Sequence, residues 1–386
     1  MTEPVLFSPF RMRGLELPNR IVVSPMGQYS ATPEGFATDW HLMHLGHLAV
    51  SGAGLVITEA TAVEPAGRVS SACLGIWSDD HIAPLRAAMA FCRRHGGASM
   101  GMQLAHAGRK GSVSVPWEKQ IALDETNGGW QLKSASPVAY PGRPVPHALS
   151  VEELAEIRDA FAAAARRAEA LDFDLLEIHN AHGYLLHSFL TPLANARTDA
   201  YGGSLEGRMR FPLEVFDAVR AAWPADRPLG VRITATDWAE GGWTLEESVV
   251  FAQRLKARGC DYVCASSGGS TPEQKIAVKP GYQVPLAERI RAEADIPTIA
   301  VGLITEPAQA EDILREGKAD LVALGRGMLY NPRWAWHAAE ALGANVYFPH
   351  PYERCHPSLR GSDFLKPFRD AKPAGDEARR KQAAGA

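Results

Sequence analysis

Cysteine is scarce and irregularly spaced in this chain of 386 residues. Its five cysteines form an odd number, and no two of them have the Cys-x-x-Cys spacing that is typical of zinc and redox sites. A small secreted fold held together by disulfides is therefore excluded. We expect buried free thiols in a protein of the reducing cytoplasm, and we predict no metal site.

Long hydrophobic runs and an excess of charge of one sign are also absent. No stretch approaches the roughly 18 apolar residues of a membrane-spanning helix, and the N-terminus lacks the apolar core of a signal peptide. Lys and Arg number 40 against 44 Asp and Glu, which gives a net charge of -4 and no basic footprint for nucleic acid. The sequence predicts a soluble cytoplasmic protein that binds neither membranes nor nucleic acid.

Eight short runs with strand character alternate with longer helical patterns. Several are continuous apolar strings, such as GLVIT and LVALG, as expected of strands covered on both faces in a parallel sheet. Capping boxes at Ser150 with Glu153 and at Thr244 with Glu247 mark the starts of two helices. The strand-like runs are residues 21–24, 54–59, 99–105, 175–179, 229–234, 262–266, 298–301 and 321–324. This order predicts an α/β fold, a single (β/α)8 TIM barrel.

A doubly wound open sheet is the alternative architecture. It is disfavoured because no Gly-x-Gly-x-x-Gly dinucleotide fingerprint follows the first strand. The longest irregular stretch, residues 111–150 after the third strand, is interpreted as a functional lid. From about Lys366 the composition becomes polar. We therefore predict one barrel domain over residues 1–365 and a disordered tail over residues 366–386.

Side chains that follow the strands of such a barrel should meet in one site. Gly302, after the seventh strand, and Gly325 with Arg326, after the eighth, suit a phosphate held by backbone amides and one guanidinium. Tight turns are the alternative role for these glycines. Arg232 and Gln103 lie within strands, and a polar heterocycle would satisfy both, although an internal ion pair is an alternative for the arginine.

His179, His182 and Tyr184 follow the fourth strand. Two imidazoles three residues apart can converge on one oxygen, and a nearby phenol can donate a proton. A metal pair with His106 as third ligand is one alternative, and histidines satisfied inside a loop are another. Substrate binding is the preferred interpretation.

Taken in order, these segments resemble the Old Yellow Enzyme family of flavin-dependent ene-reductases, in its thermophilic-like bacterial subgroup. The resemblance rests on SPMGQYS, TEATAV, GIWSD, QLAHAGRK, EIHNAHGYL, RTDAYGGS and LGRG, and covers nearly the whole chain up to Arg354. It implies a non-covalently bound FMN that NADPH or NADH reduces. The reduced flavin then gives hydride to the β-carbon of an α,β-unsaturated carbonyl compound, whose α-carbon is protonated.

The resemblance also implies roles for individual residues. Catalysis falls to His179 and His182, which hold the carbonyl oxygen, and to Tyr184, which supplies the proton. The implied flavin contacts are Ser24, Pro25, Met26, Gly27, Ala60, Gln103 and Arg232, with Gly302, Gly325 and Arg326 at the phosphate, and the implied substrate contacts add Tyr29, Tyr352 and Arg354. A homodimer or homotetramer is expected, with Arg354 and Tyr352 reaching the neighbouring subunit's site.

The sequence departs from the subgroup at Gly27, where most members have Cys and the other branch has Thr. We expect an altered flavin potential and a wider pocket. Gly207 replaces an Asn in a loop, and the chain continues past Arg354 as CysHisPro, which weakens the inter-subunit argument. Two other functions stay open: a metal-dependent barrel hydrolase or aldolase using His106, His179 and His182, and a low-activity flavin-binding sensor.

Overall fold

The computed structural model describes residues 3–356, and the chain divides into two units, Met1–Val346 and Tyr347–Ala386. Within the described residues, eight parallel strands close into a barrel in the order β10-β11-β12-β3-β4-β5-β8-β9. They are β3 (Ile21–Val23), β4 (Leu55–Ala62), β5 (Ser99–Ala105), β8 (Leu175–Asn180), β9 (Leu229–Thr234), β10 (Tyr262–Ser266), β11 (Thr298–Val301) and β12 (Leu321–Leu324). The predicted barrel is confirmed, whereas the predicted domain end at residue 365 and tail over 366–386 lie outside the described residues.

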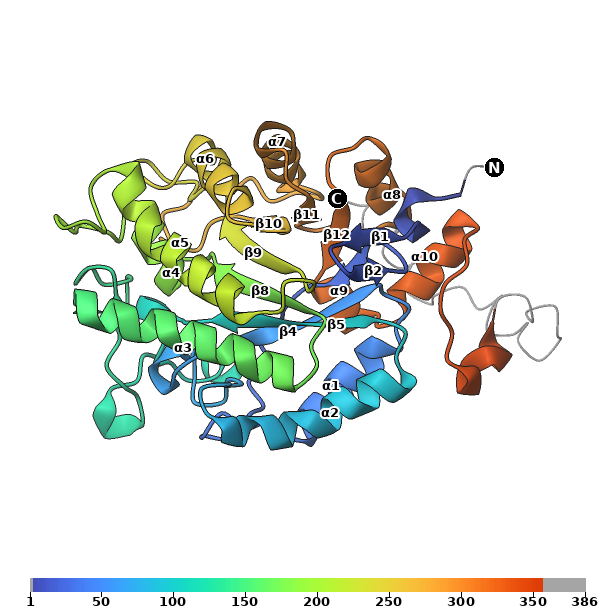
Figure 1. Ribbon diagram of the computed structural model, residues 1–386, viewed down its shortest axis with the longest axis horizontal. Helices are drawn as coiled ribbons and strands as arrows, with labels where there is room; N and C mark the ends of the chain where they lie inside the picture. The colour runs from blue at the N-terminus through green and yellow to red at the C-terminus, as the bar shows by residue number, and fades with distance from the viewer. Residues whose placement is uncertain (1–2, 357–386) are drawn as a thin grey trace, which may run out of the picture. The chain divides into compact units, whose positions relative to one another are not determined.

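Helices run between successive barrel strands and pack on the outside of the barrel (Figure 1). They are α1 (Asp39–Ala49), α2 (Ile82–His95), α3 (Val151–Ala170), α4 (Leu185–Leu190), α5 (Leu205–Ala222), α6 (Leu245–Lys256), α7 (Val284–Ala294), α8 (Pro307–Arg315), α9 (Arg326–Tyr330) and α10 (Trp334–Leu342). Both predicted capping boxes are present, at the N-termini of α3 and α6. No helix in the described part of the chain is long and apolar enough to cross a membrane.

Alternate residues of six barrel strands belong to two different hydrophobic clusters, whereas β5 and β9 contribute only to the outer one. Ile21 and Val23 pack outward with the helices, whereas Val22 packs inside the barrel with residues of seven other segments. A hairpin of β1 (Phe10–Met12) and β2 (Leu15–Leu17) contributes Met12 and Leu17 to the inner cluster. The backbone N–H of Gly14 in its turn donates to Asp226 O, before β9, at 2.9 Å, so the hairpin closes the amino-terminal end of the barrel.

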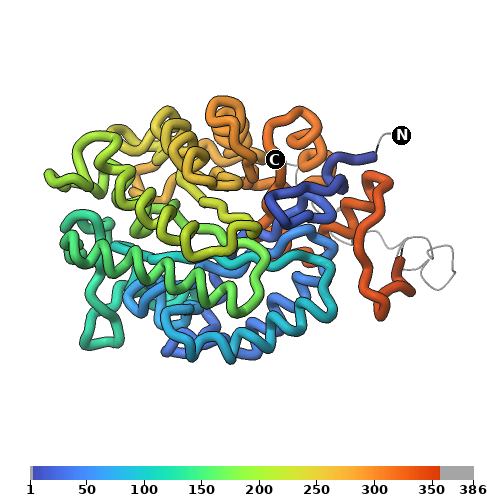
Figure 2. Tube along the Cα trace, in the orientation of Figure 1, coloured from blue at the N-terminus to red at the C-terminus, as the bar shows by residue number. Residues whose placement is uncertain are grey.

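The N-terminal segment of the chain lies next to a helix that follows the seventh strand of the barrel. The segment η1 (Val5–Phe7) lies beside α8, where the tube of Figure 2 brings blue next to orange. The backbone N–H groups of Val5 and Leu6 donate to the carboxylate of Glu311 at 3.0 and 2.8 Å.

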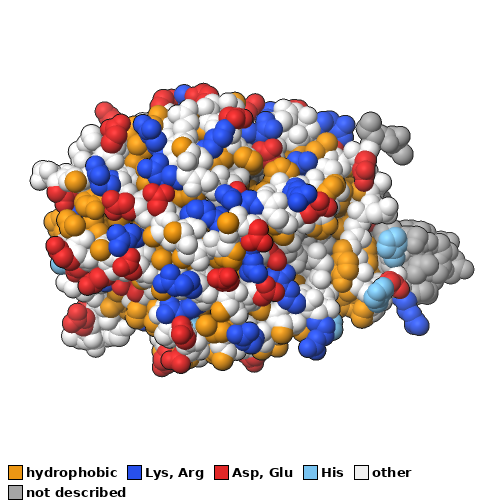
Figure 3. Space-filling model, viewed as in Figure 1, with side chains coloured by type: hydrophobic (Ala, Val, Ile, Leu, Met, Phe, Trp, Pro, Cys, Tyr) orange, Lys and Arg blue, Asp and Glu red, His pale blue; other side chains and the backbone are white. Residues whose placement is uncertain are grey.

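Acidic and basic side chains are interspersed over the face seen in Figure 3, in keeping with the small net charge.

Strand register places polar residues in rows across the carboxyl half of the barrel. Ala60 pairs with Gln103, Gln103 with Glu177, and Glu177 with Gly230. A register shift in β4 between Ile57 and Ala60 precedes this row, and such bulges often re-aim side chains next to active sites. Gln103 and Glu177 therefore lie side by side in this row of the barrel.

The predicted lid over residues 111–150 is an irregular loop with short elements inside it. These are η5 (Pro116–Glu118), η6 (Glu125–Asn127), and a two-residue parallel pair, β6 (Lys133–Ser134) and β7 (His147–Ala148). Lys133 and His106 both contact the Glu64 carboxylate, at 2.9 and 2.6 Å. Glu64 thereby ties the loop to the ends of β4 and β5.

Candidate active site

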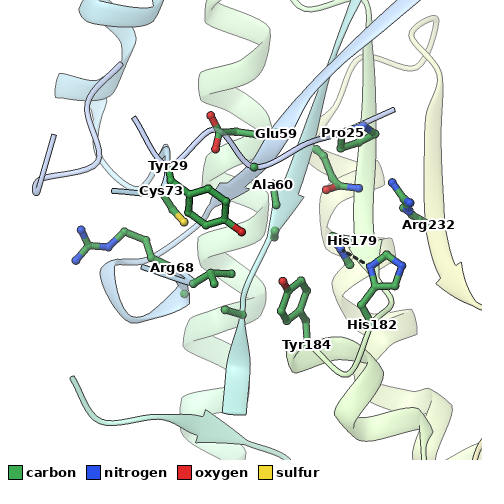
Figure 4. Close-up of a pocket in the computed structure, with 16 residues that line it drawn as sticks. Pro25, Tyr29, Glu59, Ala60, Arg68, Cys73, His179, His182, Tyr184 and Arg232 are labelled. Carbon is green, nitrogen blue, oxygen red and sulfur yellow. Dashed lines mark hydrogen bonds between the residues drawn. The ribbon is translucent and has the colours of Figure 1, made fainter. Parts of the chain in front are cut away.

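Two neighbouring cavities lie at the carboxyl ends of the barrel strands. The first, of about 170 Å³, includes Pro25, Gly27, Tyr29, Ala60, Gln103, His179, His182, Tyr184 and Arg232 in its lining (Figure 4). The second, of about 270 Å³, includes Ser24, Pro25, Met26, Arg232, Gly302, Gly325 and Arg326. Pro25 and Arg232 line both. Every predicted site residue up to Arg326 is therefore brought to one region.

Arg232 points into the barrel and not toward the helices. Its neighbours Val231 and Ile233 pack in the outer core, so alternation along β9 turns Arg232 inward. Its Nη1 donates to Ser24 Oγ at 2.9 Å. Its Nε is buried without a hydrogen-bond partner in the part of the chain that the structure describes. A buried guanidinium N–H of this kind calls for an acceptor from a ligand.

Gln103 is oriented by a carboxylate that the sequence did not single out. Its Nε2 donates to Glu177 Oε1 at 2.7 Å, and Tyr262 OH donates to Glu177 Oε2 at 3.3 Å. Burial raises the pKa of Glu177, with the Arg232 charge acting in the opposite direction. Gly230 makes room for the Tyr262 ring, because a Cβ there would lie 2.2 Å from it. The charged residue inside the apolar run LLEIH was the available signal.

The two histidines face each other at the cavity wall (Figure 4). His179 Nε2 and His182 Nδ1 are 3.2 Å apart. The other nitrogens are also engaged, since Ala181 N–H donates to His179 Nδ1 at 3.2 Å and His182 Nε2 lies 2.8 Å from Ser266 Oγ. Burial, followed by the charge of Arg232, lowers the pKa of both imidazoles well below the usual value. Both rings are therefore neutral at pH 7.

Close backbone packing fixes the histidine loop against the loop after β10. A Cβ on Gly183 would lie 2.5 Å from Gly269 O, and one on Gly269 would lie 2.6 Å from His182 Cα. Lys110 Nζ donates to the carbonyls of His182 and Gly269 at 2.7 and 2.6 Å. Burial lowers the pKa of Lys110 to about 8, with Arg109 and Arg143 adding to the effect. The sequence gives no signal for Lys110, because its partners are backbone carbonyls of distant loops.

Two tyrosines complete the cavity wall opposite each other in Figure 4. The Tyr184 ring lies 5.0 Å from the His179 ring, centroid to centroid. Burial raises the pKa of Tyr184, and burial with the nearby Cys73 and Glu59 raises the pKa of Tyr29 to about 12. Both phenols are therefore protonated, and can donate, across the physiological pH range.

Gly27 does not leave open space in the cavity, contrary to the expectation of a wider pocket. A Cβ at this position would lie 3.1 Å from two ring carbons of Tyr29 and 3.2 Å from its hydroxyl oxygen. Tyr29 has a φ of 51°, a left-handed conformation that is uncommon for a residue other than glycine. The Tyr29 ring therefore crowds the position that the Cβ of any larger residue at position 27 would take.

The third ligand of the alternative metal site is placed elsewhere. His106 Nε2 contacts Glu64 Oε1 at 2.6 Å, and its Nδ1 accepts from Gly108 N–H at 3.0 Å, so both ring nitrogens are committed. Within residues 3–356, no group of three or more His, Cys, Asp or Glu side chains is arranged to hold a metal ion. Among these described residues, the donor set required for a metal-dependent hydrolase does not assemble around His179 and His182.

Tyr352 and Arg354 lie on η7 (His350–Cys355), in the unit that begins at Tyr347. Their predicted role in a neighbouring subunit's site stays a prediction. Further residues that the sequence did not single out also line the first cavity, among them Glu59, Arg68 and Cys73. Cys73 lies beside Tyr29 in Figure 4, so the cavity does contain a thiol, although not at position 27.

Comparisons with known proteins agree on one family. Residues 5–345 match the model of the NADH:flavin oxidoreductase / NADH oxidase family. A curated NADPH dehydrogenase of Geobacillus sp. (strain WCH70) is 48% identical over 353 residues, which cover 91% of this chain and 98% of that protein. Among solved structures, morphinone reductase is similar with a TM-score of 0.74 and 28% identity, covering 91% and 92% of the two chains. A 2-naphthoyl-CoA reductase complex is similar with a TM-score of 0.79 and 25% identity, covering 87% of this chain and 52% of the other.

Proposed function

The chain belongs to the NADH:flavin oxidoreductase / NADH oxidase family, and from that membership we propose that it is an ene-reductase acting on α,β-unsaturated carbonyl compounds. It is an NAD(P)H-dependent flavin oxidoreductase of the Old Yellow Enzyme type, and its cofactor is FMN. We propose the class of the second substrate, an α,β-unsaturated carbonyl compound, and the residues that bind and protonate it.

The residues present fit FMN. The inward-facing Arg232 has a buried Nε without a partner in the described residues, and Gln103 presents an amide held in one orientation by Glu177. Such donors suit the polar edge of a flavin, and an arginine there favours negative charge on the reduced ring. We propose that Ser24, Pro25, Met26, Gly27 and Ala60 also contact the flavin, and that Gly302, Gly325 and Arg326 hold its phosphate in the second cavity.

Bound FMN would supply the redox chemistry, which is hydride transfer from NADPH or NADH to the β-carbon of the enone. The protein's part is to bind and polarise the enone. His179 and His182 donate hydrogen bonds to its carbonyl oxygen, and these bonds strengthen as negative charge develops there. Tyr184, kept protonated by burial, supplies a proton to the α-carbon, and Tyr29 packs against the substrate.

The observation that carries this proposal is the 3.2 Å separation of His179 Nε2 and His182 Nδ1 at the wall of the cavity that Arg232 and Tyr184 also line. Two neutral imidazole nitrogens at that separation can both donate to one oxygen. A carbonyl oxygen that gains charge during the reaction is the group such a pair stabilises best.

Isotope labelling tests the proposal. The protein is incubated without oxygen with NADPH and 2-cyclohexen-1-one in D₂O. We expect cyclohexanone carrying solvent deuterium at the α-carbon, and deuterium at the β-carbon only when the NADPH is itself deuterated at C4. Flavin reduction without any cyclohexanone would contradict the proposal and would favour the flavin-binding sensor. A chelator-sensitive activity in a colourless protein would favour the metal-dependent hydrolase or aldolase.

We also propose a homodimer or homotetramer in which Tyr352 and Arg354 act in the neighbouring subunit's site. Support comes from the family resemblance alone. Mixing an Arg354→Ala variant with a Tyr184→Phe variant tests it, because mixed oligomers would regain activity only where each site takes residues from two subunits. No regain of activity after verified subunit exchange would contradict the proposal.

A further inference from the structure

Ser266 is the last residue of β10. One ring nitrogen of His182 faces His179, and the other contacts the Ser266 hydroxyl. His182 Nε2 lies 2.8 Å from Ser266 Oγ. Ser266 is buried and lines the second cavity. Nothing in the family resemblance assigned a role to this residue. Because a hydroxyl can either donate or accept, its direction decides which nitrogen of His182 carries the proton.

The surroundings of Ser266 favour donation to His182. The other acceptor within reach, Gln283 Oε1, lies 3.5 Å from Ser266 Oγ, at the outer limit of a hydrogen bond, and takes a much shorter bond of 2.6 Å from Ser267 Oγ. The Nε2 of Gln283 is engaged as well, donating to Val301 O at 3.1 Å. The shorter contact, at 2.8 Å to His182 Nε2, is therefore the better place for the hydroxyl proton.

His179 is fixed by a different donor with the same result. Ala181 N–H can only donate, so His179 Nδ1 must be the unprotonated nitrogen and Nε2 must carry the proton. If Ser266 likewise donates to Nε2 of His182, the proton of that ring sits on Nδ1. The two N–H groups then lie side by side, with 3.2 Å between their nitrogens. Neither can accept from the other, so both are directed to a third atom.

We propose that Ser266 is a positioning residue that sets the Nδ1–H tautomer of His182, so that the histidine pair presents two donors to one substrate oxygen. This inference rests on the proposed function, because the oxygen is that of the enone. With the opposite tautomer, His182 Nδ1 would accept from His179 Nε2–H, so the only N–H of the pair at this position would be used between the two rings. The number of protons on the pair is the same in both arrangements.

The backbone around the pair is held rigidly enough for a single hydroxyl to matter. Thr234 Oγ1 accepts from His182 N–H at 2.7 Å and donates to Gly268 O at 3.0 Å. Lys110 clamps the carbonyls of His182 and Gly269 from the other side. Since the loop after β8 and the loop after β10 are joined by these bonds, the imidazole cannot simply move to a new partner when the hydroxyl is removed.

The test is ¹⁵N NMR of the FMN-loaded protein labelled at histidine ring nitrogens, with and without 2-cyclohexen-1-one bound to the oxidised form. Protonated and unprotonated ring nitrogens resonate far apart, so the spectrum reports the tautomer of His182 directly. Its signals are assigned by their loss in a His182→Gln variant. We expect the proton on Nδ1 in the parent and on Nε2, wholly or in part, in Ser266→Ala.

Kinetics provide the second readout. The pre-reduced protein is mixed anaerobically with the enone, and reoxidation of the flavin is followed. We expect Ser266→Ala to slow this half-reaction roughly 10- to 100-fold, since an oxyanion donor is misdirected. Ser266→Thr, which keeps the hydroxyl, should retain both the tautomer and the rate. The matched control is Ser248→Ala, which removes another buried hydroxyl, one that contacts Trp243 and the Ala235 carbonyl and neither histidine, and which should change neither the tautomer nor the rate.

An unchanged His182 tautomer in Ser266→Ala would overturn the inference, and so would a rate loss that Ser266→Thr does not restore. If the parent protein fails to reduce the enone while the tautomers behave as described, the proposed ene-reductase function fails and the tautomer assignment stands. FMN content, read from the flavin absorbance of each variant, separates a loss of the cofactor from a loss of the donor.

Discussion

A methyl group added at Gly27 should have opposite effects on stability depending on residue 29. Carbon atoms in ordinary contact lie about 3.5–4.0 Å apart, whereas a Cβ at position 27 would lie 3.1 Å from Cε2 and Cζ of Tyr29. In Gly27→Ala the ring must therefore retreat by several tenths of an ångström. The left-handed backbone of Tyr29 gives little freedom for that movement, because alternative conformations would have to rebuild the turn.

The expected magnitude follows from these contacts. Overpacking of this kind costs about 1–3 kcal/mol, so Gly27→Ala should lower the free energy of unfolding by that amount. In a Tyr29→Ala background the clash is gone. Replacing glycine by alanine at an unstrained position then stabilises by about 0.4–1 kcal/mol, because the unfolded chain loses freedom. The sign of the effect should reverse.

The assay is a double-mutant cycle on the FMN-loaded proteins: parent, Gly27→Ala, Tyr29→Ala and the double variant. Chemical unfolding gives the stabilities, and titration of the flavin absorbance with 2-cyclohexen-1-one gives the enone affinities. The coupling energy should exceed about 1 kcal/mol, as expected for residues in direct contact. The same destabilisation by Gly27→Ala in both backgrounds would refute the reasoning, because the ring could not then be what fills the space beside Gly27.

Four further outcomes are expected. Gly27→Cys should shift the flavin midpoint potential in a spectroelectrochemical titration, and an unchanged potential and substrate range would contradict a role for position 27. Arg232→Met should weaken FMN binding roughly 10- to 100-fold by fluorescence titration, since a charge-assisted hydrogen bond is worth about 1.5–3 kcal/mol. Arg232→Lys should lose less FMN affinity, and equal losses in the two variants would contradict the role given to the charge of Arg232. Tyr184→Phe should slow flavin reoxidation by the enone about tenfold or more while leaving reduction by NADPH unchanged, and equal slowing of both steps would exclude a specific proton donor. Burial raises the pKa of Glu64, but the hydrogen bonds and charges of His106 and Lys133 outweigh it and lower the pKa from 4.5 to about 2. The stability that this shift contributes is present above pH 4.5 and should be lost as the pH falls from about 4.5 to 2. In urea unfolding, Lys133→Met should lose less stability over this range than the parent, and equal losses in the two proteins would contradict this assignment.

The barrel could be predicted from the sequence because its strands are buried on both faces. Such strands appear as apolar strings, and the predicted bounds of β5, β9, β10, β11 and β12 match the structure. The β1–β2 hairpin was not predicted, because strands of three residues are too short for alternation to stand out from noise. The pair β6 and β7 inside the long loop escaped notice for the same reason.

The site was predictable only in part, and the division has a physical basis. Residues that face the cavity from strand ends could be placed by topology, and those predicted up to Arg326 line the two cavities. The supporting residues could not, because their roles depend on contacts across the fold. Ser266 meets His182 from 84 positions away, Glu177 meets Gln103 from 74, and Lys110 meets His182 from 72. No local pattern records such pairings.

The space beside Gly27 could not be predicted from the missing side chain alone. A glycine in place of a cysteine predicted extra space, but the volume at a site is set by all of its neighbours. Tyr29 takes the space, and Cys73 brings a thiol to the same cavity from another loop. The substitution is therefore better understood as one half of a Gly27–Tyr29 pair than as a loss.

The most direct test of the account is the visible absorption spectrum of the purified protein, recorded without oxygen at three stages: as purified with FMN, after one equivalent of NADPH, and after 2-cyclohexen-1-one is added. The account predicts flavin bands that bleach with NADPH and return with the enone as cyclohexanone forms. A protein that takes up no FMN, or whose bleached flavin stays reduced in the presence of the enone, would contradict it.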